Sequence, residues 1–179
     1  MKFKIYRYNN LKSTNDTAIR IIKSSNINYG MILSNLQSKG RGQYGKKWIS
    51  LKGNIFISFF YNLENLPSIK KLTKINCFII KKTLSSYIRK KINFKKPNDL
   101  LIGKKKICGI LQEKIDTLKK NFLVVGVGIN LVKSPNITNY PTTSIYEIIR
   151  KKLPKKKIET QLKKDFELKL TSLYKNKNR

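Results

Sequence analysis

The chain has 179 residues, 40% of them hydrophobic, which is enough for one domain with its own core and argues against a disordered chain. It carries 40 Lys and Arg residues against 9 Asp and Glu residues, a formal net charge of +31 that favours acidic partners, nucleic acid included. Only six of the basic residues are Arg, whereas Lys, Asn and Ile, whose codons are rich in A and T, fill 77 positions. Genomic base composition therefore accounts for much of the lysine excess.

The sequence contains no His, which excludes Ser-His-Asp and Cys-His catalysis and every His-based metal site. Cys77 and Cys108 form no CxxC motif and fit neither a zinc site nor a disulfide-dense secreted fold. A reducing cytoplasm is the expected compartment. The N-terminal residues lack the apolar core of a signal peptide, and no apolar run reaches the ~20 residues that span a bilayer, so no membrane association is expected.

The N-terminal part of the chain predicts strands, one helix and a long loop. Residues 3–8 have the pattern of a strand, and the STND of residues 13–16 offers capping side chains for a helix. Apolar runs at 30–35 and 54–60 are typical of buried strands. The polar, glycine-rich stretch between them, residues 37–53, is expected to be a long loop.

The middle of the chain predicts a helix followed by a meander. Apolar residues recur at helical spacing over 68–91, which indicates a long amphipathic helix with a lysine-rich outer side. A segment starting at Asp99, then residues 106–115 and 121–126, are separated by polar turns and predict antiparallel strands. The sheet is therefore expected to be mixed, largely antiparallel and flanked by helices.

The C-terminal part predicts two helices, at 144–152 and 157–174, with Pro154 separating them. No internal repeat, linker or second core is visible in the sequence. The prediction is a single α/β (α+β) domain over residues 1–179, in which the C-terminal helices occupy about 142–175.

The most informative stretch is residues 37–48, QSKGRGQYGKKW. Its closely spaced glycines let the backbone approach a ligand and aim N–H groups at an anion, while Arg41, Lys46 and Lys47 add positive charge. The order of residues excludes a Walker A loop and a Rossmann GxGxxG fingerprint. Taken alone, the stretch is compatible with an anion-binding loop, an RGG-like nucleic-acid segment or a flexible surface loop.

Three other motifs have ordinary structural explanations when each is taken alone. The STN of residues 13–15 is a helix cap, the KPND of residues 96–99 is a turn, and the VVGVGINL of residues 124–131 is a buried strand followed by a loop. Lysine triplets such as residues 104–106 are common in so basic a chain.

Together and in this order, STND, QSKGRGQYGKKW, KPNDLLIGKKKICGIL and VVGVGINL resemble the motifs of the biotin protein ligases, or biotin–acetyl-CoA-carboxylase ligases. The resemblance covers residues 8–131, most of the chain. It implies the class II synthetase-like catalytic fold of biotin and lipoate ligases. It also implies activation of biotin by Mg-ATP to biotinoyl-5′-AMP, and transfer of biotin to a lysine of the biotin carboxyl carrier protein of acetyl-CoA carboxylase.

The resemblance assigns biotin-binding roles to nine residues: Ser13, Thr14, Asn15, Gln37, Gly40, Arg41, Gly42, Lys106 and Gly109. Ser13, Thr14 and Gln37 would hold the ureido ring, whose polar groups are costly to bury unpaired. The loop residues at 40–42 would bring backbone donors and a guanidinium to the biotin carboxylate and the α-phosphate.

The resemblance also implies catalytic roles for Lys106 and Arg41. Lys106 aligns with a family lysine at the reacting carboxylate and phosphate, where a cation offsets the repulsion between two anions. Five residues would bind ATP: Lys46, Trp48, Asn98, Asp99 and Asn130, with Trp48 packing against adenine. Magnesium would arrive with ATP and lie near Asp99 and Asn130, because it prefers hard oxygen ligands. No general base is required, since the biotin carboxylate is already ionised.

The sequence departs from the family pattern at four points. Gln43 stands where the family usually has a second Arg, Lys46 replaces a later Arg, and Lys96 replaces the Trp of KWPND. The segment after Asn130 is too short for the small β-barrel that usually closes the family fold. No DNA-binding winged helix precedes the motifs either, so a catalytic domain without repressor function is expected.

Three alternatives remain open on the sequence: a lipoate or octanoate ligase or transferase, a basic nucleic-acid-binding protein, and an inactive truncated paralogue. The GRG…W loop and KPND…KxxGIL favour biotin. Basic residues are spread along the chain instead of being interleaved with aromatic residues on one face, which disfavours nucleic acid. The expected partner is an acidic carrier domain, and a homodimer is compatible with the sequence.

Overall fold

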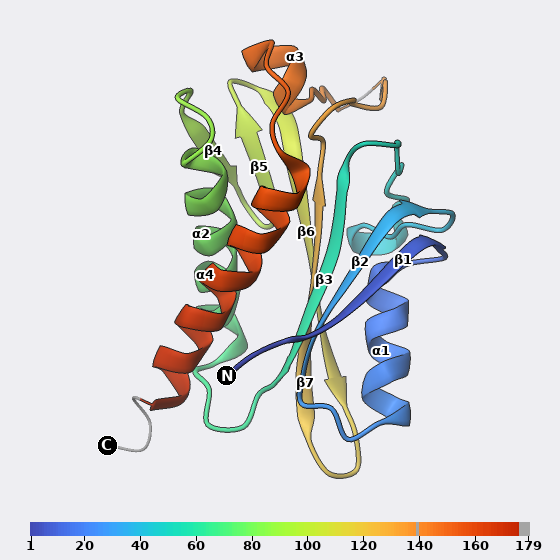
Figure 1. Cartoon of the computed structure of the whole chain (residues 1–179), viewed down its shortest axis with the longest axis vertical. Helices are drawn as coiled ribbons and strands as arrows, with labels where there is room; N and C mark the ends of the chain where they lie inside the picture. Colours follow the sequence, from blue (N-terminus) through green and yellow to red (C-terminus); the bar gives the residue numbers. More distant parts are fainter. Residues whose placement is uncertain (139, 176–179) are drawn as a thin grey trace.

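The apolar runs of the chain form one seven-stranded sheet in the computed structural model, which describes residues 1–138 and 140–175 (Figure 1). The strand order is β1-β2-β3-β7-β6-β5-β4. The strands are β1 (Lys4–Leu11), β2 (Tyr29–Gln37), β3 (Ile55–Asn62), β4 (Ile92–Lys95), β5 (Asp99–Ile102), β6 (Lys105–Asp116) and β7 (Asn121–Ile129). Only β1 and β2 pair in parallel among the described strands, which confirms the predicted mixed, largely antiparallel sheet.

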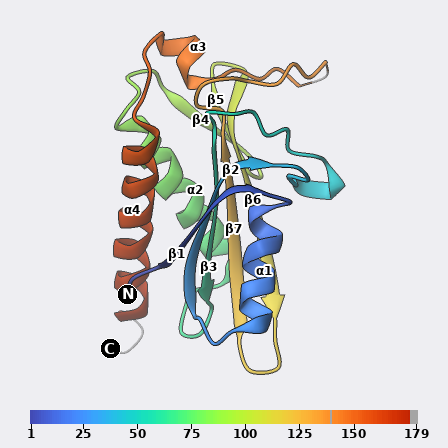
Figure 2. The same cartoon turned by 45° about the vertical axis from the view of Figure 1, so that its right-hand side comes forward.

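Helices cover both faces of the sheet. They are α1 (Thr14–Ser24), α2 (Ile69–Ser85), α3 (Ile145–Ile149) and α4 (Lys155–Lys175), with a short 3-10 turn, η1 (Gln43–Gly45). In both views α2 and α4 lie side by side on one face, and α1 lies on the other (Figures 1 and 2). The larger core lies beneath α2 and α4, and a smaller one beneath α1.

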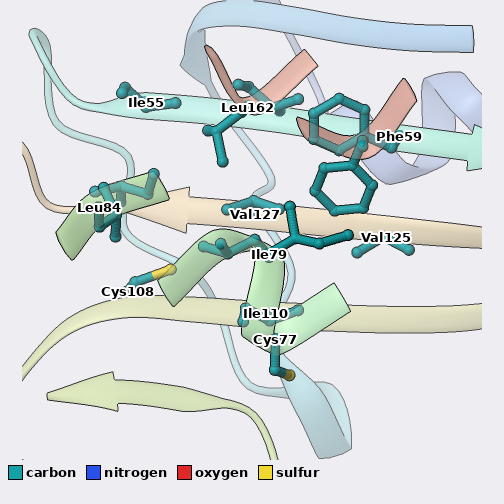
Figure 3. Close-up of a cluster of buried hydrophobic side chains, with 14 of the residues drawn as sticks. Ile55, Phe59, Cys77, Ile79, Leu84, Cys108, Ile110, Val125, Val127 and Leu162 are labelled. Carbon is teal, nitrogen blue, oxygen red and sulfur yellow. The ribbon is translucent and has the colours of Figure 1, made fainter. Parts of the chain in front are cut away.

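Strand β3 occupies the centre of the sheet, and every one of its eight residues is buried. Its side chains alternate between the two cores: Phe59 packs beneath α2 and α4, whereas Phe60 packs beneath α1. A strand buried on both faces needs apolar residues at nearly every position, which explains the continuous run of IFISFFYN. Figure 3 shows part of the larger core, where Ile79 and Leu84 of α2 lie near Val127 of β7.

Local sequence signals fix the helix ends. Ser13 is the N-cap of α1 and accepts a hydrogen bond from the backbone N–H of Asp16 (3.3 Å). Ser144 and Glu147 form a reciprocal capping box at α3. The expected break at Pro154 is confirmed, because α4 begins directly after it.

The helix predicted over 68–91 is too long at its C-terminal end. The structure ends α2 at Ser85, and residues 92–95 form the edge strand β4, which the sequence pattern did not predict. Ile88 continues the helical spacing but enters the core from the turn that follows the helix. The helix predicted over 144–152 is also shorter, since Arg150 takes a left-handed conformation (φ 54°) and closes α3.

Residue 139 and residues 176–179 of the predicted domain lie outside the described residues. Among the described helices, none has the length and hydropathy to cross a bilayer.

Replacing Phe166 with Ala should destabilise the fold strongly. Phe166 of α4 is fully buried and stacks on Phe59 of β3, with ring centroids 4.1 Å apart. Removing such a ring costs about 3 to 5 kcal/mol of unfolding free energy. Chemical denaturation measures the change. Leu168→Ala is the control on the same helix, because Leu168 is 72% exposed and its truncation should cost less than about 1 kcal/mol. Equal losses in the two variants would contradict this packing.

Candidate functional site

A cleft of about 960 Å³ opens on the α1 side of the sheet. Its walls come from the N-terminal end of α1, the loop after β2, the facing parts of β5, β6 and β7, and the segment that follows β7. These segments are far apart in sequence and meet because β5, β6 and β7 are neighbours in the sheet.

Thirteen of the fourteen residues singled out from the sequence line this cleft. They are Ser13, Thr14, Asn15, Gln37, Arg41, Gly42, Lys46, Trp48, Asn98, Asp99, Lys106, Gly109 and Asn130. Gly40 is the exception, and its backbone packs closely against the chain at Trp48: a Cβ atom there would lie 2.6 Å from the carbonyl oxygen of Trp48. The three family departures Gln43, Lys46 and Lys96 also line the cleft.

Strand β7 provides a floor without side chains. Val125 and Val127 point into the larger core, whereas Phe122 and Val124 of the opposite face pack beneath α1. The next two positions on that opposite face are Gly126 and Gly128, so the strand leaves space beside the N-terminal end of α1.

Two side chains fill this space closely. A Cβ atom on Gly126 would lie 2.3 Å from Oδ1 of Asn15, and one on Gly128 would lie 2.4 Å from Cε2 of Trp48. On the neighbouring strand, a Cβ atom on Gly109 would lie 2.6 Å from Cζ3 of Trp48. The indole therefore lies flat against two adjacent strands, which only glycine permits.

The loop that carries Trp48 is a small closed structure. Trp48 N–H donates to the carbonyl of Gly40 (2.9 Å), Gly42 N–H donates to the carbonyl of Lys46 (2.6 Å), and Arg41 pairs with Lys47. Tyr44 at the tip has a positive φ of 54° and is 90% exposed. The Nε1 atom of Trp48 is buried and has no hydrogen-bond partner among the described residues.

At one end of the cleft, amide and hydroxyl groups form a polar pocket. Gln37 Oε1 accepts hydrogen bonds from the backbone N–H of Thr14 (2.8 Å) and from its hydroxyl (3.0 Å). Gln37 Nε2 donates to Ser50 Oγ (3.2 Å). The Asn15 amide is held by Ser58, whose hydroxyl donates to its oxygen (2.5 Å). These groups are fixed in place before any ligand binds.

Arg41 is held by two carboxylates. Its Nη2 lies 2.8 Å from Asp16 Oδ1 and 2.8 Å from Glu113 Oε2. Partial burial alone would lower the pKa of the guanidinium, but the hydrogen bonds and charges of Glu113 and Asp16 outweigh it and raise that pKa. Arg41 is therefore a permanent cation in the wall of the cleft.

Lys106 pairs with Asp99 at the other end of the cleft. Its Nζ lies 2.6 Å from Asp99 Oδ1, 5.3 Å from the centre of the Trp48 ring and 5.2 Å from that of Tyr140. The Tyr140 hydroxyl donates to the second oxygen of Asp99. Burial, reinforced by the Asp99 carboxylate, raises the pKa of Tyr140, which keeps its hydroxyl protonated as a donor.

Two amide side chains flank this ion pair. Asn98 Nδ2 donates to the carbonyl of Ile110 (2.9 Å) and so ties the start of β5 to β6. Asn130 Nδ2 donates to the carbonyl of Thr143 (3.4 Å), while its buried Oδ1 has no hydrogen-bond partner among the described residues. An unpartnered buried oxygen indicates a position for a donor or a cation.

The model of one protein family matches residues 8–130, and that family is the biotin/lipoate A/B protein ligases. The chain belongs to this family. It is 33% identical over 102 residues to the bifunctional ligase/repressor BirA of Escherichia coli, covering 55% of this chain and 32% of BirA. It is 28% identical over 151 residues to biotin–protein ligase 2 of Arabidopsis thaliana, covering 80% of this chain and 44% of that protein.

Among solved structures, the biotin protein ligase of Aquifex aeolicus in complex with biotin and ATP superposes with a TM-score of 0.81 at 27% identity. The match covers 96% of this chain and 72% of that one. The predicted family fold is therefore confirmed. The chain spans less than half the length of the two curated relatives above.

Three residues in or beside this family member's cleft were not predicted from the sequence. Glu113 gave no signal, because it is one polar residue within a strand. Tyr140 lies in an irregular segment whose path no periodicity reveals. Gly126 was visible as a strand glycine, a residue that often marks the close approach of another group.

Gly128→Ala should displace Trp48, the only tryptophan of the chain, because the new methyl group would overlap its ring. We expect a red-shifted Trp48 emission and stronger quenching by acrylamide, with the far-ultraviolet circular dichroism unchanged. Val125→Ala, on the opposite face of the same strand, is the control and should leave the emission as it is. An emission maximum that does not move in Gly128→Ala would contradict the position of the indole.

Proposed function

We propose that the chain is an ATP-dependent biotin protein ligase. It would convert biotin and ATP to biotinoyl-5′-AMP and pyrophosphate, then transfer biotin to a lysine of the biotin carboxyl carrier protein of acetyl-CoA carboxylase. The observation that carries the proposal is one cleft with a fixed polar pocket at one end, a glycine floor in the middle and a lysine at the other. The names of the relatives support the same activity.

Biotin would lie in the cleft beside Trp48, with its ureido ring in the polar pocket. The Thr14 hydroxyl and the Gln37 amide are pre-oriented by their mutual hydrogen bonds, so binding costs little side-chain entropy. Ser13 and Asn15 line the same end, and Gly109 accommodates the Trp48 ring, against which the valeryl chain would pack.

The carboxylate of biotin would point toward the side chains of Lys106 and Arg41. In the first step a carboxylate oxygen attacks the α-phosphorus of ATP and pyrophosphate leaves. Lys106 and Arg41, with the N–H groups of the loop at 40–42, would offset the repulsion between these anions and stabilise the charge that develops in the transition state. In the second step the amine of the acceptor lysine attacks the acyl carbon, AMP leaves, and the amine proton is released.

The nucleotide would bind across Trp48. The lining of the cleft includes six basic side chains: Arg41, Lys46, Lys47, Lys95, Lys96 and Lys106. Such a concentration of positive charge suits a triphosphate. Magnesium would enter with ATP, and the oxygens of Asp99 and Asn130 are the hard ligands available to it, one of them unpartnered in the structure. Asn98 would keep β5 in place beneath the nucleotide.

The acceptor is expected to be an acidic carrier domain. The chain carries a net charge of +31, which attracts negatively charged protein surfaces and speeds their association with it. We place the reaction in the cytoplasm, where a reducing environment suits the two free thiols, Cys77 and Cys108.

Lipoate and octanoate ligation is the second candidate, since the matched family includes lipoate ligases. The hydrogen-bonded Thr14–Gln37–Ser50 pocket favours biotin. A dithiolane or alkyl end has no urea group to use the hydrogen-bonding capacity that these amides and hydroxyls keep beyond their mutual bonds.

The test is incubation of the full chain with Mg-ATP and biotin, lipoate or octanoate, followed by mass spectrometry of the acyl-adenylate and measurement of pyrophosphate. We expect biotinoyl-AMP and no comparable product from the other acids. Lipoyl-AMP as the main product would reassign the substrate, and the absence of all three adenylates would refute the proposed activity.

Lys106→Met should lower the rate of pyrophosphate release by about a hundredfold, which corresponds to the loss of one cation at the transition state. Lys105→Met is the matched control, because Lys105 is the neighbouring, exposed residue of the same strand. Thermal unfolding of each variant reports on the fold. Near-normal release from folded Lys106→Met would remove Lys106 from the mechanism.

Gln43→Arg should reduce self-biotinylation. The family pattern has an Arg at this point of the loop, and Gln43 lines the cleft without a charge to hold the adenylate. Loss of a charge-assisted hydrogen bond speeds escape of the intermediate by roughly ten- to hundredfold, and escaped adenylate acylates lysines. Mass spectrometry after incubation with biotin and Mg-ATP counts the modified lysines. Equal labelling of the native chain and the Arg variant would show that Gln43 is neutral.

A further inference from the structure

A single oxygen atom joins two walls of the cleft. Glu113 Oε2 accepts from Asn15 Nδ2 (2.7 Å) at the start of α1 and from Arg41 Nη2 (2.8 Å) in the glycine-rich loop. Asp16 adds a second carboxylate, with Oδ1 also 2.8 Å from Nη2 of Arg41. Neither Asp16 nor Glu113 lines the cleft itself.

These contacts use only part of the hydrogen-bonding capacity of Arg41. A guanidinium has five N–H donors in a rigid fork, and the two carboxylates both approach Nη2. The donors on Nε and Nη1 have no partner among the described residues and remain for an anion in the cleft. The long side chain, which is 38% exposed, would otherwise sample many rotamers.

Acidic residues are rare in this chain, yet two of them contact the same arginine. Of its nine Asp and Glu residues, Asp16 and Glu113 hold Arg41. They come from α1 and β6, so the loop is fastened to two rigid elements at once.

We propose that Asp16 and Glu113 are positioning residues for Arg41. They clamp Nη2 and orient the rest of the guanidinium toward the carboxylate and phosphate of the reacting substrates. The inference rests on the proposed function, because it assigns these two carboxylates to the adenylation step. The opposite arrangement, in which the carboxylates withdraw Arg41 from the substrates, predicts an effect of opposite sign.

The experiment measures kcat and KM for biotin in pyrophosphate release by the full chain. The variants are Glu113→Gln and Asp16→Asn, each alone and combined with Arg41→Ala. Asp116→Asn is the matched control, because Asp116 also lies on β6 and also forms an ion pair, with Lys114 (2.6 Å), but is not part of the cleft. Thermal unfolding shows whether each variant is folded.

We expect Glu113→Gln and Asp16→Asn each to lower kcat/KM by about tenfold, as for a displaced charge-assisted contact, and Asp116→Asn to leave it unchanged. In the Arg41→Ala background neither change should have a further effect, because both act through Arg41. A tenfold loss that persists in that background would mean that Glu113 acts through Asn15, and it would overturn the inference.

Two other results would also overturn it: a rise in kcat/KM in Glu113→Gln, or values in both variants equal to those of Asp116→Asn. If the unmodified chain releases no pyrophosphate with biotin, the proposed function fails and the inference fails with it. Activity in the unmodified chain, with no effect of either carboxylate, would remove the inference alone.

Discussion

The close contact between one indole ring and two glycines determines the shape of the cleft. Trp48 lies against Gly109 of β6 and Gly128 of β7, at distances that no Cβ atom would permit. This contact fixes the loop over the sheet, and the loop in turn carries Arg41 to the wall of the cleft. The glycines also explain why a sheet that is buried on both faces still has a cleft. Strand β7 supplies apolar side chains to the larger core, while its other face changes from Val124 to Gly126 and Gly128.

The second constraint is electrostatic. With a net charge of +31, the chain brings many cations near anionic substrates. The two cations assigned to the reaction, Arg41 and Lys106, must also be held in fixed positions. Three of the nine acidic residues hold them: Asp99 pairs with Lys106, and Asp16 and Glu113 pair with Arg41. The Lys106–Asp99 pair is partly buried and is therefore screened less by salt than an exposed pair, so this lysine is held while exposed lysines remain solvated.

The sequence was sufficient for the family, the mixed sheet and most of the cleft, because its motifs lie in short segments whose residue types are needed locally. It was insufficient where the outcome depended on contacts between distant segments. The helical spacing continued to Ile88, yet α2 ended at Ser85 and the chain returned to the sheet as β4. Likewise, no local sequence pattern around Glu113 indicates that its partner is Arg41, which lies 72 residues away along the chain.

The central claim is that the glycine-floored cleft binds biotin and ATP side by side. The fluorescence of Trp48 tests it most directly, because this is the only tryptophan and it forms part of the cleft wall. Titration of the chain with biotin and with Mg-ATP should each give a saturable change in emission, and octanoate at the same concentrations should give none. An emission that stays constant through both titrations would contradict the account.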